Sequence, residues 1–275
     1  EMDATEMGVL PLDGTPAVMN TGSVLGKDPV LTTSAGRHFL IDRSRGVDLF
    51  YELDSCGHGV AQTSTRGFDE TGWTDPQDVA VGPDGVFWVA RLLSPKIFVE
   101  RPVQTFVDLS SLDADGNPDA SSIRIVGNQA FVALERLTND VSQQPSQIAV
   151  LDATSLALAQ TITLKGRNPF GLMVESAGKL WLADVGSRFD AAEPGAGIEV
   201  VDTTTFTSTV LISEATLGAS VFQVAVNATC GAAIVGDSSV ANKTSLVSFS
   251  LDGSNVATTP GFGPTTGFDL RGLAW

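Results

Sequence analysis

The chain has 275 residues, of which 43% are hydrophobic and only 17% are charged, and its formal net charge is −16. This apolar fraction is large enough to build a folded core. The acidic charge argues against a nucleic acid or an anionic membrane as partner, because phosphate groups are bound by basic surfaces. No stretch approaches 18 consecutive apolar residues, so the sequence predicts no membrane-spanning helix.

The composition favours strands over helices. Gly occurs 28 times and Pro 13 times, Thr, Ser and Val are common, and Lys and Glu are scarce, which is unfavourable for long helices. We therefore expect an all-β fold. High Thr, Ser and Gly with low Lys is also typical of exported bacterial proteins. The expected protein is periplasmic, secreted or a surface lipoprotein, with any export signal removed before residue 1.

Two strand-like runs, Gly8–Leu12 and Ala17–Asn20, are followed by a sequence repeat. Residues Asp75–Ala90 align without a gap with Asn168–Ala183, and weaker copies begin at Asp28, Ser122 and Val221. The turn residues of successive copies are Gly36, Gly85, Asn128, Gly178 and Gly231, at spacings of 49, 43, 50 and 53 residues. This is the period of a β-propeller blade or a similar four-strand unit.

Each copy predicts four strands in the same order. A short first strand, a Gly or Asn turn and an apolar second strand such as Phe87–Ala90 come first, and a loop of variable length follows. The predicted third strands are Val47–Tyr51, Lys96–Val99, Gln147–Asp152, Gly197–Asp202 and Ser245–Phe249. More polar fourth strands follow, as at Ala159–Leu164 and Thr207–Ile212. The sequence therefore predicts a single β-propeller domain over residues 1–275.

The number of blades follows from the two ends of the chain. Five repeats run from about Asp28 to Phe262, and residues 267–275 begin a sixth. The strands in residues 1–27 can complete this last blade, which would remove its open edges. We predict six blades, the last one incomplete or closed by both termini, and seven blades if the chain continues beyond Trp275.

The repeats resemble those of the NHL and YVTN propeller families. Their shared pattern, Pro-x-Gly followed by an apolar strand, a Gly turn and a second strand, is strongest at Pro76 and Pro169, weaker at Pro29 and Val221, and poor at Ser122. The resemblance covers nearly the whole chain. It implies the fold but hardly the function, because propellers include lactonases, sensors and scaffolds.

Candidate metal ligands occupy the position just before the innermost strands. Asp75, Asn168 and Asp269 come from alternate repeats and offer oxygen ligands suited to Ca²⁺ or Mg²⁺. The chain is distantly similar to the regucalcin and gluconolactonase propellers, which hold one divalent ion with Glu, Asn and Asp and open lactones. No Glu occupies this position here, which puts that chemistry in doubt. Asp75 and Asn168 each precede Pro, so they are also typical turn residues.

Two residues further along each repeat lies a candidate ligand site. Gln77, Arg124, Phe170, Phe222 and Arg271 would form a partly apolar pocket with two cations, suited to a small anionic ligand. The alternative is that such arginines pair with some of the 32 carboxylates of the chain. The Asp-rich segment 113–119 resembles a calcium loop but lacks its terminal Glu, so a polar turn is the preferred interpretation.

No set of acid, base and nucleophile converges at these positions. We therefore predict an extracytoplasmic β-propeller that acts as a binding or scaffold protein for a small anionic ligand or a protein partner. The alternative is a divalent-metal-dependent lactonase-like hydrolase with its site in the central channel.

Overall fold

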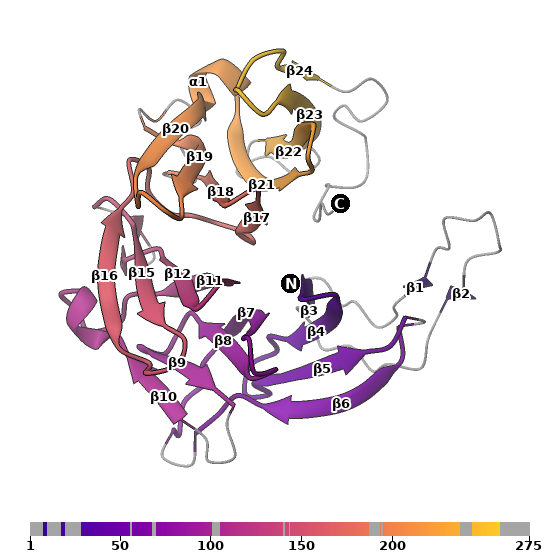
Figure 1. The fold of residues 1–275 in the computed structure, drawn as a ribbon, viewed down its shortest axis with the longest axis vertical. Coiled ribbons are helices and arrows are strands. Elements are labelled where there is room, and N and C mark those ends of the chain that lie inside the picture. Colours follow the sequence, from indigo (N-terminus) through magenta and orange to yellow (C-terminus); the bar gives the residue numbers. More distant parts are fainter. Residues whose placement is uncertain are drawn as a thin grey trace. The chain divides into compact units, whose positions relative to one another are not determined.

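The computed structural model describes residues 8–9, 18–19, 29–55, 57–67, 70–100, 105–139, 141–142, 144–186, 193, 195–236 and 244–258. The chain divides into two compact units, Glu1–Ile123 and Arg124–Trp275. Strands dominate both units in Figure 1. The described helical segments are one α-helix, α1 (Glu214–Leu217), and one 3-10 turn, η1 (Ser110–Leu112). No helix in the described part of the chain is long and apolar enough to cross a membrane.

The first unit contains two four-stranded antiparallel sheets, blade 1 and blade 2. Blade 1 has the order β3-β4-β5-β6, with bounds Pro29–Ser34, Arg37–Asp42, Leu49–Leu53 and Gly59–Ser64. Blade 2 has the order β7-β8-β9-β10, with bounds Pro76–Val81, Phe87–Arg91, Lys96–Val99 and Thr105–Asp108. Two short strands, β1 (Gly8–Val9) and β2 (Val18–Met19), pair with each other.

The second unit contains most of blade 3 and all of blades 4 and 5. Blade 3 joins β11 (Ala120–Val126), β12 (Gln129–Leu134), β15 (Gln147–Asp152) and β16 (Leu158–Thr163). Blade 4 joins β17 (Val174–Ser176), β18 (Lys179–Asp184), β19 (Gly197–Asp202) and β20 (Ser208–Ser213). Blade 5 joins β21 (Ser220–Val226), β22 (Cys230–Gly236), β23 (Ser245–Ser250) and β24 (Ala257–Thr258). A small hairpin, β13 (Leu137–Thr138) with β14 (Val141–Ser142), extends the loop between β12 and β15.

The all-β β-propeller is confirmed, but the prediction of six or seven blades is wrong: the described residues form five. The N-terminal strands β1 and β2 pair with each other as a two-residue hairpin, and β24 already serves as the outer strand of blade 5. Residues 267–275, predicted to start a sixth blade, lie outside the described residues.

Apolar side chains of neighbouring sheets form the core. In the first unit, Phe39 and Phe50 of blade 1 pack edge-to-face on each other and on Phe87 of blade 2, with ring centroids 5.2 to 5.9 Å apart. Val79 and Phe98 of blade 2 belong to the same cluster and are fully buried. Such edge-to-face pairs stabilise beyond the area they bury. The second strands are apolar because both of their faces are covered.

In three blades a proline at or before the start of the inner strand pairs with a charged residue at the end of the second strand. The pairs are Pro29 with Asp42, Pro76 with Arg91, and Pro169 with Asp184. Proline is tolerated as the first residue of a strand, where its missing N–H is not needed for the ladder. The three charged partners are buried, with exposed fractions of 7%, 0% and 0%. Each must therefore be paired or neutralised.

Asp78 joins three strands of the first unit. Its carboxylate is fully buried and accepts hydrogen bonds from Thr32 Oγ1 of β3 (2.8 Å), from Ser122 Oγ (2.7 Å) and from the amide of Ile123 (2.9 Å), the last two at the start of β11. The amide of Val79 donates to it as well, at 2.9 Å. Protein donors thus replace the water molecules that the carboxylate loses on burial. The buried side chain thereby links three strands.

Replacing Asp78 with Ala is expected to destabilise the protein by about 3 kcal/mol, because the Ile123 amide and two hydroxyl groups lose a buried acceptor. Urea unfolding followed by fluorescence measures this loss. Asp84→Ala, in the exposed turn between β7 and β8, is the matched control and should change stability by less than about 0.5 kcal/mol. Equal losses for the two variants would contradict the assignment.

Candidate functional site

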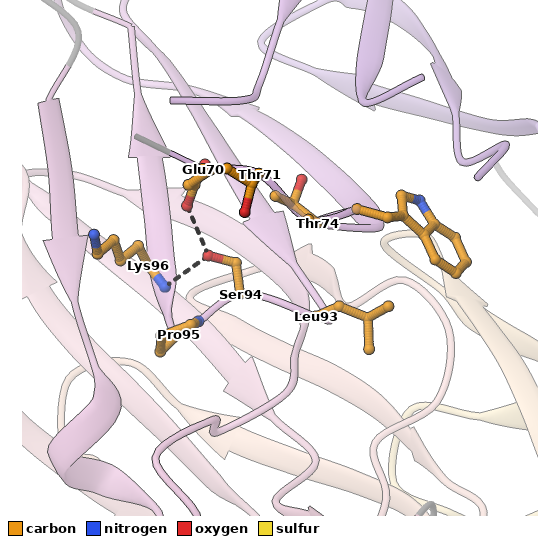
Figure 2. A pocket seen from close by; sticks show the side chains of 9 residues that line it. Glu70, Thr71, Thr74, Leu93, Ser94, Pro95 and Lys96 are labelled. Atoms are coloured by element: carbon orange, nitrogen blue, oxygen red, sulfur yellow. Dashed lines mark hydrogen bonds between the residues drawn. The ribbon is translucent and has the colours of Figure 1, made fainter. Parts of the chain in front are cut away.

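A pocket of about 320 Å³ lies at one end of blade 2. One wall is the segment between β6 and β7, with Glu70, Thr71 and Trp73, and the other is the loop between β8 and β9, with Leu93 and Pro95. Figure 2 shows Ser94 between Glu70 and the main chain of Lys96, with a hydrogen bond to each. The pocket therefore lies at the end of the blade where the inner strand starts and the second strand ends.

Main-chain hydrogen bonds and a buried carboxylate fix the first wall. The amides of Leu92 and Leu93 donate to the carbonyls of Asp75 (2.9 Å) and Thr74 (3.0 Å), which joins the two walls. Asp48 is fully buried and accepts from the amide and the hydroxyl of Thr74, both at 2.9 Å. It also pairs with Arg66. The backbone of this wall is therefore held in place before any ligand arrives.

Arg91 lies beneath the pocket and holds both walls. Its guanidinium is fully buried and donates to the carbonyl of Thr65 (2.9 Å) and, through Nε and Nη2, to the carbonyl of Lys96 (2.8 and 2.6 Å). Nη1 also donates to Glu70 Oε2 at 2.5 Å, and the group lies 5.1 Å from the ring centroid of Phe106. The planar fork of arginine suits this set of acceptors, which a lysine could not satisfy.

Glu70 is the carboxylate of the pocket, and its surroundings keep it ionised. Burial alone would raise its pKa, but hydrogen bonds from Arg91, the Gly67 amide and Ser94 outweigh burial and lower the pKa below its usual value. A carboxylate of this kind carries no proton at neutral pH and is a poor general acid. The geometry therefore suits positioning and binding better than proton transfer.

Lys96 is the charged pocket residue that is left for a ligand. It forms no ion pair among the described residues, although it lies opposite Asp108 in the β9–β10 register. Leu93 is 47% exposed on the neighbouring wall. The Trp73 indole N–H has no hydrogen-bond partner in the described part of the chain. Figure 2 shows the Lys96 side chain directed away from Leu93, with Ser94 and Pro95 between them. A ligand that used both ends of the pocket would need an anionic group at one end and an apolar body at the other.

The predicted ligand residues Gln77, Phe170 and Phe222 share an irregularity of the inner strand. The β7–β8 register jumps from Pro76 to Asp78, and the β21–β22 register jumps from Val221 to Gln223, so Gln77 and Phe222 are skipped in the ladder. Phe170 lies between the isolated Pro169 bridge and the start of β17. Bulges of this kind are common next to functional sites because they re-aim a side chain.

The structure brings some of the predicted ligand residues together. In the second unit, the rings of Phe170 and Phe222 pack edge-to-face at 6.5 Å. Gly171 makes this possible: its φ is +88°, and a Cβ there would lie 2.5 Å from the carbonyl oxygen of Phe222. Arg124 belongs to the same unit, and Arg271 lies outside the described residues. Gln77 is in the first unit, where its Oε1 accepts from Arg43 Nη1 at 2.6 Å.

Two of the three predicted metal ligands, Asp75 and Asn168, lie in the described residues. Asp75 and Asn168 both adopt left-handed backbone, with φ of 51° and 55°, and their carbonyls accept from the amides of Leu92 and Val185. Asp269 lies outside the described residues. No group of three or more His, Cys, Asp and Glu side chains suited to a metal ion occurs in the described part of the chain. Binding of Ca²⁺ or Mg²⁺ by Asp75, Asn168 and Asp269 stays a prediction.

Sequence reasoning missed Glu70 and the pocket itself. Arg91 is the last residue of β8, and it forms an ion pair with Glu70. Glu70 has no repeat counterpart that marks it. Glu70 and Arg91 are 21 residues apart in the sequence, and their contact becomes apparent only when the β6–β7 segment is placed against blade 2.

Comparison with known proteins supports the fold. No protein-family model matches the chain, and no curated protein does. Among solved structures, streptogramin B lyase matches with a TM-score of 0.62 and 14% identity, covering 98% of this chain and 78% of that chain. A catalytically inactive variant of virginiamycin B lyase from Staphylococcus aureus, with quinupristin, gives 0.63 and 14%, covering 94% and 78%. Hydrazine synthase from Kuenenia stuttgartiensis gives 0.55 and 16%, covering 87% and 69%.

At these identities the likeness shows the fold alone, a β-propeller. A specific relationship to the NHL and YVTN repeats, or to the regucalcin propellers, stays a prediction.

Arg91→Ala is expected to destabilise the protein by about 3 kcal/mol, because it leaves the Glu70 carboxylate buried without its cation. The double variant Arg91→Ala with Glu70→Gln should recover part of this loss, since it removes the unpaired charge. Chemical unfolding of the wild type, both single variants and the double variant gives the coupling energy. Strictly additive losses would show that the two groups do not depend on each other.

The lowered pKa of Glu70 predicts that the stability of the protein depends on pH. Because its pKa is lower in the folded protein than in the unfolded chain, the stability it contributes is present above the unfolded pKa of about 4.3 and is lost as the pH falls through the folded pKa. The difference in Tm between wild type and Glu70→Gln should therefore shrink as the pH is lowered from 6 to 3. A constant difference across this range would be the contrary result.

Proposed function

We propose that the protein is an extracytoplasmic binding protein whose pocket on blade 2 takes the carboxylate end of a small molecule or of a partner's side chain. The observation that carries this proposal is the pocket of about 320 Å³, which has fixed walls, a carboxylate paired with Arg91 and a lysine that forms no ion pair with any described residue. The exported location rests on the composition of the chain.

The charges of the pocket favour binding over catalysis. Glu70 is paired with Arg91 and accepts from two further donors, the Gly67 amide and the Ser94 hydroxyl, so its carboxylate is held as a hydrogen-bond acceptor. A general acid or base needs a pKa near the working pH, whereas Glu70 is moved away from it. Lys96 offers an ammonium at the rim, and Leu93, Pro95 and Trp73 offer apolar surface for the body of the ligand.

The size of the pocket limits the ligand. A volume of about 320 Å³ is at the lower end for small-molecule sites, which suits a monocarboxylic acid with one ring. Phenylacetate is therefore a suitable probe. It combines one carboxylate for Lys96 with one ring for the apolar wall, and it cannot bridge to a distant site.

Phenylacetate is expected to raise the Tm of the wild type, with about 1.4 kcal/mol of stabilisation at ten times Kd. Lys96→Ala should abolish the rise because it removes the cation. Lys179→Ala, an exposed lysine at the start of β18 in the second unit, is the matched control and should leave the rise unchanged. A rise that survives in Lys96→Ala would place binding elsewhere.

The competing functions are outcomes of the same assay. Ca²⁺ and Mg²⁺ test the lactonase-like alternative: a Tm rise that is lost in Asp75→Ala with Asn168→Ala, together with lactone turnover, would replace the binding proposal. Quinupristin is included because it accompanies one structural neighbour. Its conversion by the wild-type protein would equally show an enzyme rather than a binding protein.

A further inference from the structure

Three carboxyl groups are buried together in blade 4. Asp184 ends β18, Glu199 lies on β19, and Glu214 begins α1. All three are fully buried. Asp184 and Glu199 both lie against Gly166: its amide donates to Glu199 Oε2 at 2.8 Å, and a Cβ on it would lie 2.5 Å from Asp184 Oδ2. Two acidic groups therefore share one small space.

Asp184 occupies the same position in blade 4 as Arg91 in blade 2. Each ends its second strand, and each lies opposite a proline: Arg91 opposite Pro76, which begins β7, and Asp184 opposite Pro169, which lies before β17. The amides that follow, Leu92 and Val185, make the same main-chain hydrogen bond. In blade 2 the buried charge meets a carboxylate of opposite sign, Glu70. In blade 4 it meets further carboxylates.

The hydrogen bonds distinguish the two groups. Glu199 accepts from the amides of Lys165 and Gly166, both at 2.8 Å, and from the hydroxyl of Ser208. Both oxygens of Glu199 therefore act as hydrogen-bond acceptors. Neither oxygen of Asp184 has a donor among the described residues, and the group within hydrogen-bonding reach is Glu199, which is itself an acceptor.

No cation in the described part of the chain forms an ion pair with Asp184. The charged groups around it are Glu199 and Glu214, and Lys165 and Arg167 in the segment between β16 and β17. Arg167 is engaged by Glu193 and by the carbonyl of Ser142, and the side chain of Lys165 is exposed. A fully buried, ionised carboxylate beside two others would be strongly unfavourable.

We propose that Asp184 carries a proton in the folded protein, donates it in a hydrogen bond to Glu199, and so makes the start of blade 4 a pH-sensitive element. The proton turns two facing acceptors into a donor and an acceptor. It also gives one Asp184 oxygen a hydrogen-bond partner, whereas neither oxygen has a donor among the described residues.

The proton stabilises a segment that carries predicted ligand residues. Glu199 holds the amides of Lys165 and Gly166, and the same segment continues through Asn168 to Phe170, which packs on Phe222. Ionisation of Asp184 would push it away from Glu199 and Gly166. The order of residues 165–170 is therefore expected to depend on pH, whereas the pocket of blade 2 is held by an ion pair.

The direction of the pH effect follows from burial. Burial, together with the charges of Glu199 and Glu214 and the contact with Glu199, raises the pKa of Asp184 well above its usual range. A carboxyl group with a raised pKa contributes stability that is fully present below the unfolded pKa of about 3.9 and is lost as the pH rises toward the folded pKa.

The test compares Tm from pH 5 to pH 9 for the wild type and Asp184→Asn. The amide keeps a donor toward Glu199 but cannot ionise, so the variant should be more stable than the wild type by at least about 3 °C at pH 8 and by less at pH 5. Infrared spectra at pH 7 should show the carbonyl stretch of a protonated carboxyl group in the wild type, and this band should be missing in Asp184→Asn.

Asp202→Asn is the matched control in the same blade. Asp202 is partly exposed, and the amides of Thr205 and Thr204 lower its pKa, so its replacement should reduce Tm by a constant amount from pH 5 to pH 9. The proposal is overturned if the difference between wild type and Asp184→Asn does not change with pH, or if the infrared band is absent. A Tm rise with Ca²⁺ or Mg²⁺ that requires Asp184 would also overturn it, because a cation would then occupy the place of the proton.

Discussion

The structure depends on how three of the blades neutralise a charge that they bury. In these blades a charged residue ends the second strand opposite a proline, and it is Asp42, Arg91 or Asp184. Isolated buried charges are too costly to keep, so every such position needs a partner. Arg91 finds Glu70 and three main-chain acceptor contacts. The loops that supply these partners are the ones that form the pocket, so the site follows from the electrostatics of the fold.

Buried polar groups also link strands that the ladders do not. Asp78 accepts from β3 and from the start of β11, and Asp48 accepts from the segment before β7. Apolar packing between sheets does not by itself fix the register or orientation of the loops. A buried acceptor with several donors does, because each missing hydrogen bond leaves a desolvated group. The rigid pocket wall is a consequence of these polar anchors rather than of the apolar core.

The repeat in the sequence predicted much of the fold and little of the site. In blades 2, 3 and 4 the third strand has the predicted bounds residue for residue. These strands, β9, β15 and β19, are apolar runs between clear turns. The blade count failed because it depended on the ends of the chain, where the repeat is incomplete. The bulges at Gln77 and Phe222 have no local signal, since they depend on pairing with the second strand. Glu70 was missed because its partner is 21 residues away and the contact crosses two loops.

One position of the repeat therefore leads to two different kinds of behaviour. An arginine at the end of the second strand recruits a carboxylate, and the resulting pair keeps its charges over the pH range in which most proteins work. An aspartate at the equivalent position meets Glu199 and Glu214 and needs a proton, which can leave. The backbone hydrogen bonds around the two residues are the same. The pocket therefore responds to acid through Glu70, whereas the blade 4 segment responds to rising pH through Asp184. This difference arises from the sign of the charge at one position of the repeat and from the partners that the loops provide.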